Sequence, residues 1–240
     1  MNNKKVCVIA GANSEIGIEI AKKIYKEYRL VLCWHTHNNR ILNYIDSLDA
    51  TVFQADLQRE IDCIKLFDYC ISEFGRIDSL INCIGLNDYS ENITEDVWDK
   101  ILSANLKPVF FLSKHFLSYF SRNNFASYGH IINFSSTAGV NPNPTSPHYV
   151  TSKAGVIALT KYYAKLYAPK VMVNSIAPGF VATSNHCSSK YDSVKHKIPL
   201  QRMASVEEVA QSVYFILHSD YITGQTLLID GGMTAEMLRF

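Results

Sequence analysis

Three side chains that can hold or exchange a proton occur in one part of the chain, namely Ser136, Tyr149 and Lys153. Tyr149 opens a helical pattern and Lys153 follows four residues later, so a helix would place both side chains on one face. A free tyrosine, with a pKa of about 10, exchanges few protons near neutral pH. An adjacent ammonium group stabilises the phenolate, and a serine hydroxyl can hydrogen-bond the same substrate oxygen. The three residues favour proton transfer to or from a carbonyl or alcohol oxygen, although a Tyr/Lys pair alone is usually just helix surface.

A glycine-containing turn at residues 10–17, Ala-Gly-Ala-Asn-Ser-Glu-Ile-Gly, separates the first apolar run from the first helical pattern. Gly11 allows a tight turn and the close approach of a pyrophosphate, while Gly17 lets the helix pack closely on the sheet. The helix N-terminus then offers unpaired N–H groups and the positive end of its dipole. An ordinary strand-to-helix loop would look the same, so this signal is weak when taken alone. In the dinucleotide interpretation the binding residues are Gly11, Asn13, Ser14, Ile16 and Gly17.

The end of the second apolar run bears on the choice of cofactor. Dinucleotide folds that bind NAD have an acidic residue here for the ribose 2′-hydroxyl, whereas a 2′-phosphate needs hydrogen-bond donors or positive charge. Residues 33–40 contain no Asp or Glu, and they offer donors from His35, Thr36, His37 and Arg40. The pattern favours NADP(H) over NAD(H), with a merely solvated polar loop as the alternative.

Short apolar runs alternate with amphipathic helical patterns along the chain. The runs expected as strands are Val6–Ala10, Arg29–Trp34, Thr51–Ala55, Leu80–Ile84, His130–Phe134, Val171–Ile176 and Leu227–Ile229. Helical periodicity covers residues 16–25, 61–71, 97–120, 156–166 and 206–217. Near-continuous apolar strands are covered on both faces, and this alternation is typical of a parallel sheet. We expect an α/β fold with helices on both faces of the sheet and, because no Pro/Gly/Ser-rich linker divides the chain, one domain over residues 1–240.

The composition of the 240 residues narrows the class of protein. Its 23 basic and 22 acidic residues leave a net charge of +1, which indicates neither a nucleic-acid partner nor a membrane surface. None of the six cysteines forms a CxxC pair, and we expect reduced thiols without disulfides or a metal site. The first apolar segment is too short for a signal peptide, and no run approaches the ~20 apolar residues of a membrane span. We expect a cytoplasmic protein.

Several motifs occur together, in one order, along nearly the whole chain. After the turn at 10–17 come Ala-Asp-Leu at 55–57, Ile-Asn-Cys-Ile-Gly at 81–85, Asn-Leu at 105–106, the run ending in Ser-Ser at 131–136, Tyr-Val-Thr-Ser-Lys at 149–153, Asn-Ser-Ile-Ala-Pro-Gly at 174–179 and a Gly-rich tail at 222–233. In this combination the chain resembles the short-chain dehydrogenase/reductase superfamily, in particular its 3-oxoacyl-[acyl-carrier-protein] reductases. The resemblance implies a Rossmann-type doubly wound sheet of about seven parallel strands.

The resemblance also implies roles for individual residues, carried over by position. Tyr149 would donate the proton and Ser136 would orient the carbonyl. Lys153 would bind the nicotinamide ribose and lower the pKa of Tyr149, while Asn105 would hold a water in a proton relay. The further cofactor contacts expected are His35 and Thr36 after the second strand, Asp56 and Leu57 at the adenine, Asn82 and Gly85 at the adenosine ribose, and Pro178, Gly179, Val181 and Thr183 near the nicotinamide and phosphates.

The chain departs from the family pattern in the phosphate turn. Glu15 stands where the family usually has its second glycine. An acidic side chain suits a helix N-terminus but lies near a site meant for phosphate anions. If the side chain points to solvent it does little harm, and if it points inward it lowers cofactor affinity. The usual Asn-Asn-Ala-Gly after the fourth strand reads Asn-Cys-Ile-Gly at 82–85, and the usual threonine before the turn is Ala10.

These observations lead to one expected function and two alternatives. The first is NADPH-dependent reduction of a 3-oxoacyl thioester on an acyl carrier protein, in fatty-acid or polyketide-like synthesis. The second is a reductase or dehydrogenase of a free small molecule such as a sugar, steroid or polyol. The third is a non-catalytic cofactor-binding sensor, which only Glu15 favours. The loop at about 183–204 should select the substrate, and a homotetramer is expected from the family, with residues 109–120 and the C-terminal segment at its interfaces.

Overall fold

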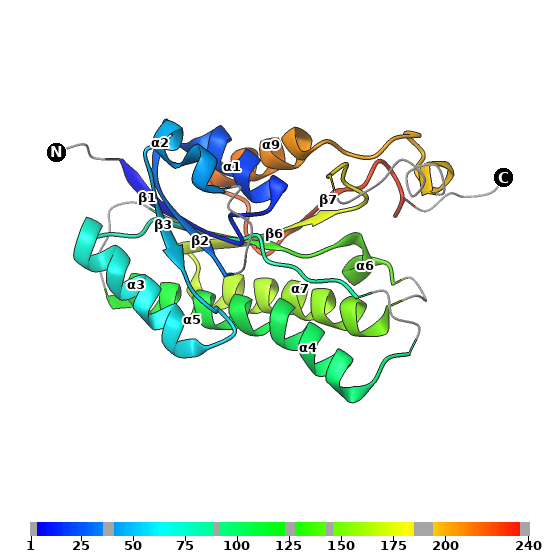
Figure 1. The fold of residues 1–240 in the computed structure, drawn as a ribbon, viewed down its shortest axis with the longest axis horizontal. Coiled ribbons are helices and arrows are strands. Elements are labelled where there is room, and N and C mark those ends of the chain that lie inside the picture. Colours follow the sequence, from blue (N-terminus) through cyan, green and yellow to red (C-terminus); the bar gives the residue numbers. More distant parts are fainter. Residues whose placement is uncertain are drawn as a thin grey trace.

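A parallel sheet of seven strands forms the centre of the fold (Figure 1). The computed structural model describes residues 4–35, 41–88, 92–122, 128–142, 146–184 and 194–235. The strands lie in the order β3-β2-β1-β4-β5-β6-β7. Their bounds are β1 Lys5–Ala10, β2 Tyr28–Trp34, β3 Ala50–Gln54, β4 Ser79–Asn82, β5 Gly129–Phe134, β6 Val171–Pro178 and β7 Thr226–Ile229. This is the predicted doubly wound, Rossmann-type α/β sheet, and its direction of winding reverses between β1 and β4.

Helices cover both faces of this sheet (Figure 1). One face carries α1 Glu15–Ile24, α2 Ile45–Leu48 and α9 Val206–Leu217, and the other carries α3 Glu60–Phe74, α4 Glu95–Asn105, α5 Lys107–Arg122 and α7 Pro147–Tyr167. The short helix α6 Thr137–Val140 follows β5, and the described residues also form two 3₁₀ turns, η1 Ile41–Tyr44 and η2 Lys195–Lys197. Among the described helices, none is long and apolar enough to cross a membrane.

The apolar strands show why the sheet is covered twice. In β1, Val6, Val8 and Ala10 pack in the core cluster under α3, α5 and α7, whereas Cys7 and Ile9 pack in the cluster under α1 and α9. Successive side chains of a strand point to opposite faces, so an uninterrupted apolar run buries both. The Cys7 thiol is fully buried, and burial raises its pKa well above the usual range. This cysteine is a packed core residue, as predicted.

The helical stretch at 97–120 is the main point where the structure differs from the sequence prediction. It is not one helix but two, α4 and α5, which are separated at Leu106. Pro108 lacks a backbone N–H and disfavours helical geometry at the residue before it, so the first helix ends and a new one begins with the proline in its first turn. The break leaves Asn105 as the last residue of α4.

Strand β4 ends earlier than the sequence indicated. Its last residue is Asn82, and Cys83, Ile84 and Gly85 form an irregular segment at the carboxyl edge of the sheet. The other predicted strands match the observed ones with shifts of a residue or two at their ends. The early end of β4 frees the carbonyl of Ile84 from the strand ladder, which matters for the site described below.

Gly11 holds the first strand-to-helix turn against the end of β4. Its φ angle is +80°, and a Cβ added to it would lie 2.2 Å from the carbonyl oxygen of Cys83. Gly75, at the C-terminus of α3, also has a positive φ of +69°, but nothing lies within 4 Å of a Cβ added there. The two glycines therefore share a backbone conformation and differ in their surroundings.

We predict that Gly11→Ala lowers the free energy of unfolding by much more than Gly75→Ala. Both substitutions place a side chain on a left-handed residue, at about 1–2 kcal/mol. Gly11→Ala must also displace the backbone at Cys83, so we expect a loss of about 3 kcal/mol or more. Urea denaturation of both variants measures the difference. Equal losses would show that the close approach of the two loops does not contribute to stability.

Candidate active site

Helix α7 carries the predicted proton-transfer pair. The helix begins at Pro147, a residue suited to the first turn because its missing N–H has no intrahelical partner there. Tyr149 is half-buried and Lys153, one turn later, is 2% exposed. The Lys153 Nζ atom lies 5.9 Å from the centroid of the Tyr149 ring. The structure therefore places the two side chains on one helix face with a cation close to the phenol.

Two backbone carbonyls hold the buried ammonium group. Lys153 Nζ donates to the carbonyl of Ile84 at 3.0 Å and to that of Phe134 at 2.9 Å. Burial disfavours the charged form and lowers the pKa of Lys153 to about 8, an effect that the nearby Cys83 thiol opposes. An amine with this pKa is still mostly protonated near neutrality, so it presents a positive charge in a water-poor site.

Ser136 lies at the carboxyl end of β5, two residues after the carbonyl that binds Lys153. It caps α6, and its Oγ accepts a hydrogen bond from the N–H of Ala138 at 3.2 Å. Helix α6 presses closely on α7, because a Cβ on Gly139 would stand 2.7 Å from the carbonyl carbon of Lys153. The hydrogen bond of Lys153 to Phe134 and the packing of α6 on α7 therefore place Ser136 in the neighbourhood of Lys153.

Asn105 braces three segments around the pair. Its Oδ1 accepts from the N–H of Leu86 at 2.7 Å, and its Nδ2 donates to the carbonyl of Leu86 at 2.9 Å and to Ser152 Oγ at 2.9 Å. Ser152 in turn donates to the carbonyl of Tyr149 at 2.8 Å. Both amide hydrogens of this fully buried side chain are thus used within the protein. The side chain thereby fixes α4, the β4 loop and α7 relative to one another.

A cavity of about 270 Å³ opens at the carboxyl ends of the first four strands. Five residues expected to contact the cofactor line it, namely Gly11, His35, Asp56, Leu57 and Gly85. The sequence prediction missed the other lining residues, which are Trp34, Gln58, Ile84, Leu86, Ala104 and Pro108. Most of these residues are neighbours in sequence of a predicted residue. Their position at or just after the end of a predicted strand is the signal that could have identified them. Thr36, His37 and Arg40 lie outside the described residues.

Asn82, one of the predicted cofactor contacts, does not line this cavity. Its side chain is completely buried in the sheet and donates from Nδ2 to Asn133 Oδ1 at 2.8 Å. Asn133 then donates to Thr160 Oγ1 at 2.9 Å. This chain of hydrogen bonds links β4, β5 and α7 from the inside. A pattern of residue types does not show that a strand-end amide turns inward.

The first turn of α1 has the features of a phosphate site. Ser14 caps the helix, since its Oγ accepts from the N–H of Gly17 at 3.0 Å and donates to the carbonyl of Gly11 at 2.9 Å. A Cβ on Gly17 would lie 2.7 Å from the Gly11 carbonyl oxygen, so only glycine allows this packing. Asn13 lies in this turn, and Ile16 in the first turn of α1. The turn and the neighbouring cavity fit a dinucleotide.

The segment after β6 approaches the same region from the other side. Gly179 donates to the carbonyl of Ile229 at 2.9 Å, and Val181 forms a parallel bridge with Ala204. These bonds guide Pro178–Thr183 past the carboxyl edge of the sheet. Of the predicted substrate loop, residues 183–184 and 194–204 are described, and Asn185, His186 and Tyr191 lie outside the described residues.

Glu15 is neither free in solvent nor turned toward the sheet. Its carboxylate oxygens accept from the backbone N–H of Ser184 at 3.0 and 3.1 Å, and Oε1 also accepts from the Ser184 hydroxyl. The residue that departs from the family pattern therefore contacts the start of the predicted substrate loop, a contact between positions far apart in the sequence.

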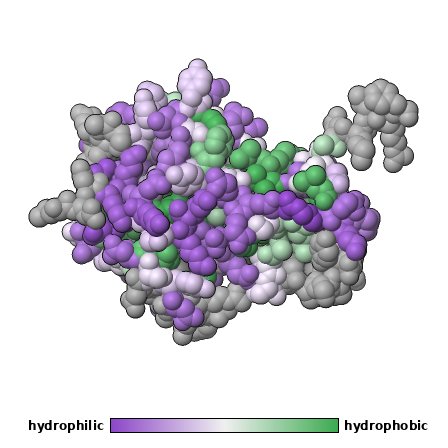
Figure 2. Space-filling model, turned by 90° about the horizontal axis from the view of Figure 1, so that it is seen from above, coloured by the Kyte–Doolittle hydropathy of each residue, from purple (hydrophilic) through white to green (hydrophobic). Residues whose placement is uncertain are grey.

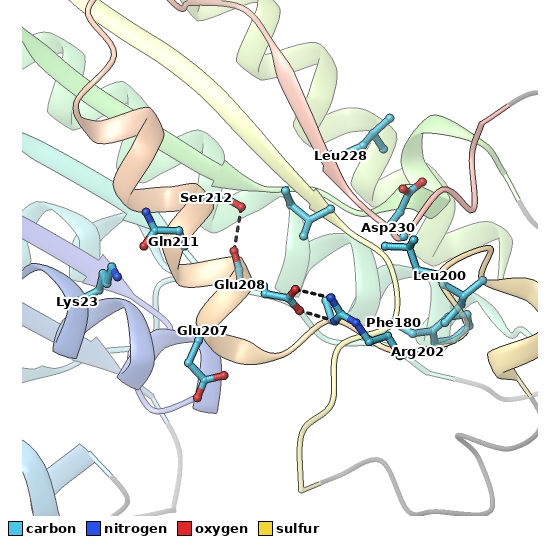
Figure 3. Close-up of a pocket in the computed structure, with 14 residues that line it drawn as sticks. Lys23, Phe180, Leu200, Arg202, Glu207, Glu208, Gln211, Ser212, Leu228 and Asp230 are labelled. Carbon is cyan, nitrogen blue, oxygen red and sulfur yellow. Dashed lines mark hydrogen bonds and ion pairs between the residues drawn. The ribbon is translucent and has the colours of Figure 1, made fainter.

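A second cavity of about 560 Å³ lies beside α9 and β7, and Tyr149 does not line it (Figure 3). Arg202 and Glu208 form a doubly hydrogen-bonded ion pair at its wall, with N–O distances of 2.7 and 2.6 Å. Phe180, Leu200 and Leu228 supply apolar lining. Seen from the α1 and α9 side, most of the surface is hydrophilic, with hydrophobic patches between (Figure 2). The ion pair is exposed, and it joins the end of the predicted loop to α9.

The fold and these residues define a dinucleotide-dependent oxidoreductase. The family model described as "Enoyl-(Acyl carrier protein) reductase" matches residues 10–234. The chain belongs to the short-chain dehydrogenase/reductase superfamily.

Relatives and solved structures extend over nearly the whole chain. The 3-oxoacyl-[acyl-carrier-protein] reductase FabG of Thermotoga maritima is 32% identical over 95% of this chain and 97% of its own. Glucose 1-dehydrogenase 2 of Bacillus subtilis is 30% identical over 96% and 95%. A short chain dehydrogenase from Bacillus anthracis superposes with a TM-score of 0.87 at 26% identity, covering 98% of both chains. The structure titled "ElxO with NADP Bound" gives 0.87 at 26%, covering 97% and 100%.

We predict that carbonyl reduction slows in alkali with an apparent pKa of about 8, because the Lys153 ammonium loses its proton there. The neutral amine no longer stabilises charge on Tyr149. The measurement is kcat/KM between about pH 6 and pH 10. Lys153→Met should be inactive throughout, while Lys161→Met, at an exposed position of the same helix, should keep the wild-type profile. A wild-type rate constant that is flat across this range would contradict the prediction.

The same pKa shift predicts the opposite trend for stability. Lys153 has a folded-state pKa of about 8 against an ordinary value of 10.5. Between these values the unfolded chain binds more protons than the folded one, so this group makes the free energy of unfolding rise with pH. The difference in unfolding free energy between wild type and Lys153→Met, measured in urea across that window, should shift in favour of the wild type as pH rises. A constant difference would contradict the buried, charged state of the lysine.

Proposed function

We propose that the protein reduces the carbonyl of a 3-oxoacyl thioester to an alcohol with NADPH. The observation that carries the chemistry is the buried Lys153 ammonium beside Tyr149. The thioester is favoured by the 3-oxoacyl-[acyl-carrier-protein] reductases among the relatives, which come from three organisms at 30–32% identity. NADP(H) is favoured by the His35 side of the cavity, since no acidic residue follows β2 up to residue 40. Fatty-acid or polyketide-like synthesis would supply such a substrate.

The residues of the chain act on the oxygen of the substrate. Ser136 hydrogen-bonds the carbonyl oxygen and holds it, and Tyr149 gives that oxygen its proton. Lys153 stabilises the phenolate that remains, at a place where burial strengthens the electrostatic interaction. When bound, NADPH supplies the hydride that goes to the carbonyl carbon. Asn105 keeps α4, the β4 loop and α7 in register, so that the tyrosine and lysine stay in place.

A free small-molecule substrate is the second candidate. Glucose 1-dehydrogenase 2 matches this chain as fully as the carrier-protein reductases do. The tyrosine and lysine serve either substrate, so they do not decide between them. The loop at about 183–204 would make the choice, with an acyl carrier protein as partner in the first case only. A sensor without turnover is the least supported function, because the four polar residues are all present and braced.

We predict that acetoacetyl thioesters are reduced faster with NADPH than with NADH, and faster than free ketones. Tyr149→Phe removes the proton donor and should lower the rate at least about 100-fold. Tyr162→Phe, an equivalent change at a 61% exposed position of the same helix, should leave it unchanged. NADPH absorbance follows all these reactions. Turnover of free ketones or sugars alone would reject the thioester and keep the reductase, while NADPH binding without turnover would favour the sensor.

We also propose a homotetramer, and the exposed apolar face of α5 and α7 supports it. A groove of about 730 Å³ runs along these helices, and its apolar lining is Leu102, Leu106, Phe110, Leu159 and Tyr162. Phe110 and Tyr162 are 39% and 61% exposed. Large contiguous apolar surface on a helix pair is typical of protein–protein contacts. The C-terminal residues Met237, Leu238 and Phe240, also expected at an interface, lie outside the described residues.

We predict that wild type elutes with four times the mass of one chain and that Phe110→Glu elutes as a smaller species. A carboxylate in the middle of the groove cannot be buried without a partner. Tyr221→Glu introduces the same charge at a fully exposed position after α9 that does not line the groove, and should leave the mass unchanged. Size-exclusion chromatography with light scattering distinguishes these cases. A wild-type monomer at micromolar concentration would refute the tetramer.

A further inference from the structure

Glu15 and Ser184 join two segments that lie far apart in the sequence. Glu15 is the first residue of α1, and Ser184 follows Thr183 in the segment after β6. The Ser184 N–H donates to both carboxylate oxygens, at 3.0 and 3.1 Å, and the Ser184 hydroxyl donates to one of them. We call this pair of residues the Glu15–Ser184 clasp.

The two ends of the clasp adjoin the two segments that we expect to form the walls of the cofactor site. The Gly11–Gly17 turn forms one wall, and the carboxylate extends from the first residue of the helix that this turn begins. The strip Pro178–Thr183 forms the other wall, and its course is set by the bonds of Gly179 to Ile229 and of Ala182 to Ala204. A clasp between these walls closes the site at its phosphate end.

The clasp allows the Glu15 carboxylate, an anion, to lie next to a site for phosphate groups. A carboxylate at a helix N-terminus is stabilised by the helix dipole, but an uncompensated one would repel a pyrophosphate. Ser184 supplies two donors, which fix the carboxylate in one direction. Hydrogen bonds to a charged group are stronger than those between neutral groups. The negative charge of Glu15 is thereby held at Ser184, in the segment after β6.

We propose that Glu15 is a positioning residue for the cofactor, and that the clasp slows the release of NADP(H). Glu15 acts through Ser184 by holding the strip Pro178–Thr183 against the phosphate turn. The inference rests on the cofactor site of the proposed reductase but not on its substrate. It is tested by binding alone, so a failure to find the right carbonyl compound leaves the test intact.

The experiment is stopped-flow dissociation of NADPH, followed by its fluorescence as excess NADP⁺ displaces it. Glu15→Gln removes the charge and should speed release about tenfold, which corresponds to about 1.4 kcal/mol. Ser184→Ala removes the hydroxyl but keeps the backbone N–H, so it should speed release by a smaller factor. Both substitutions weaken the same Glu15–Ser184 contact. The double variant should therefore release NADPH no faster than the faster of the two single variants. Ser184→Thr keeps both donors, the backbone N–H and a hydroxyl, and should release NADPH as slowly as the wild type does.

Glu19→Gln is the matched control, since Glu19 lies one turn further along α1 and pairs with Lys22 at 3.4 Å. Glu19→Gln removes one negative charge from α1, as Glu15→Gln does, and it should leave the rate of NADPH release unchanged. Slower release or tighter binding in Glu15→Gln would overturn the inference, because the carboxylate would then merely repel the phosphates. Additive effects of the two substitutions, or no effect of either, would overturn it as well. Thermal unfolding of each variant shows that the protein remains folded.

Discussion

The burial of the Lys153 ammonium group is the constraint around which this site is built. Removing a charged amine from water costs several kcal/mol unless polar partners replace the water. The replacement comes from the carbonyls of Ile84 and Phe134, at the ends of two adjacent strands. The Ile84 carbonyl is available only because β4 stops at Asn82. The length of a strand, the position of α7 and the pKa of the lysine are therefore parts of one arrangement.

The parallel sheet explains why so many segments can serve one lysine. All seven strands end at the same edge, so the loops after β1, β4, β5 and β6 converge there. Gly11 approaches the β4 loop at a distance that excludes any side chain, and Gly139 does the same between α6 and α7. Asn105 then joins the β4 loop to Ser152. Rigid contacts of this kind keep the proton donor in a fixed position while the substrate reacts.

Sequence reasoning reached the features that depend on local pattern. Apolar strands, helical periodicity and the four-residue spacing of Tyr149 and Lys153 predicted the sheet and the placement of the pair. It missed features that depend on contacts between distant segments. The break at Leu106 has a local signal in Pro108, which periodicity masked, but the inward turn of Asn82 depends on Asn133 and Thr160, from another strand and α7. Residue types alone do not specify such partners.

Glu15 shows how a departure from a family pattern acquires a partner. With a glycine at this position, a bound phosphate would be the sole anion at the N-terminus of the helix. A glutamate adds a carboxylate there that is always present. An attached carboxylate competes at high effective concentration for any donor within reach. Two donors from Ser184, in the segment after β6, bind its oxygens. The acidic residue and the phosphate site are compatible because the donors for each lie on different segments.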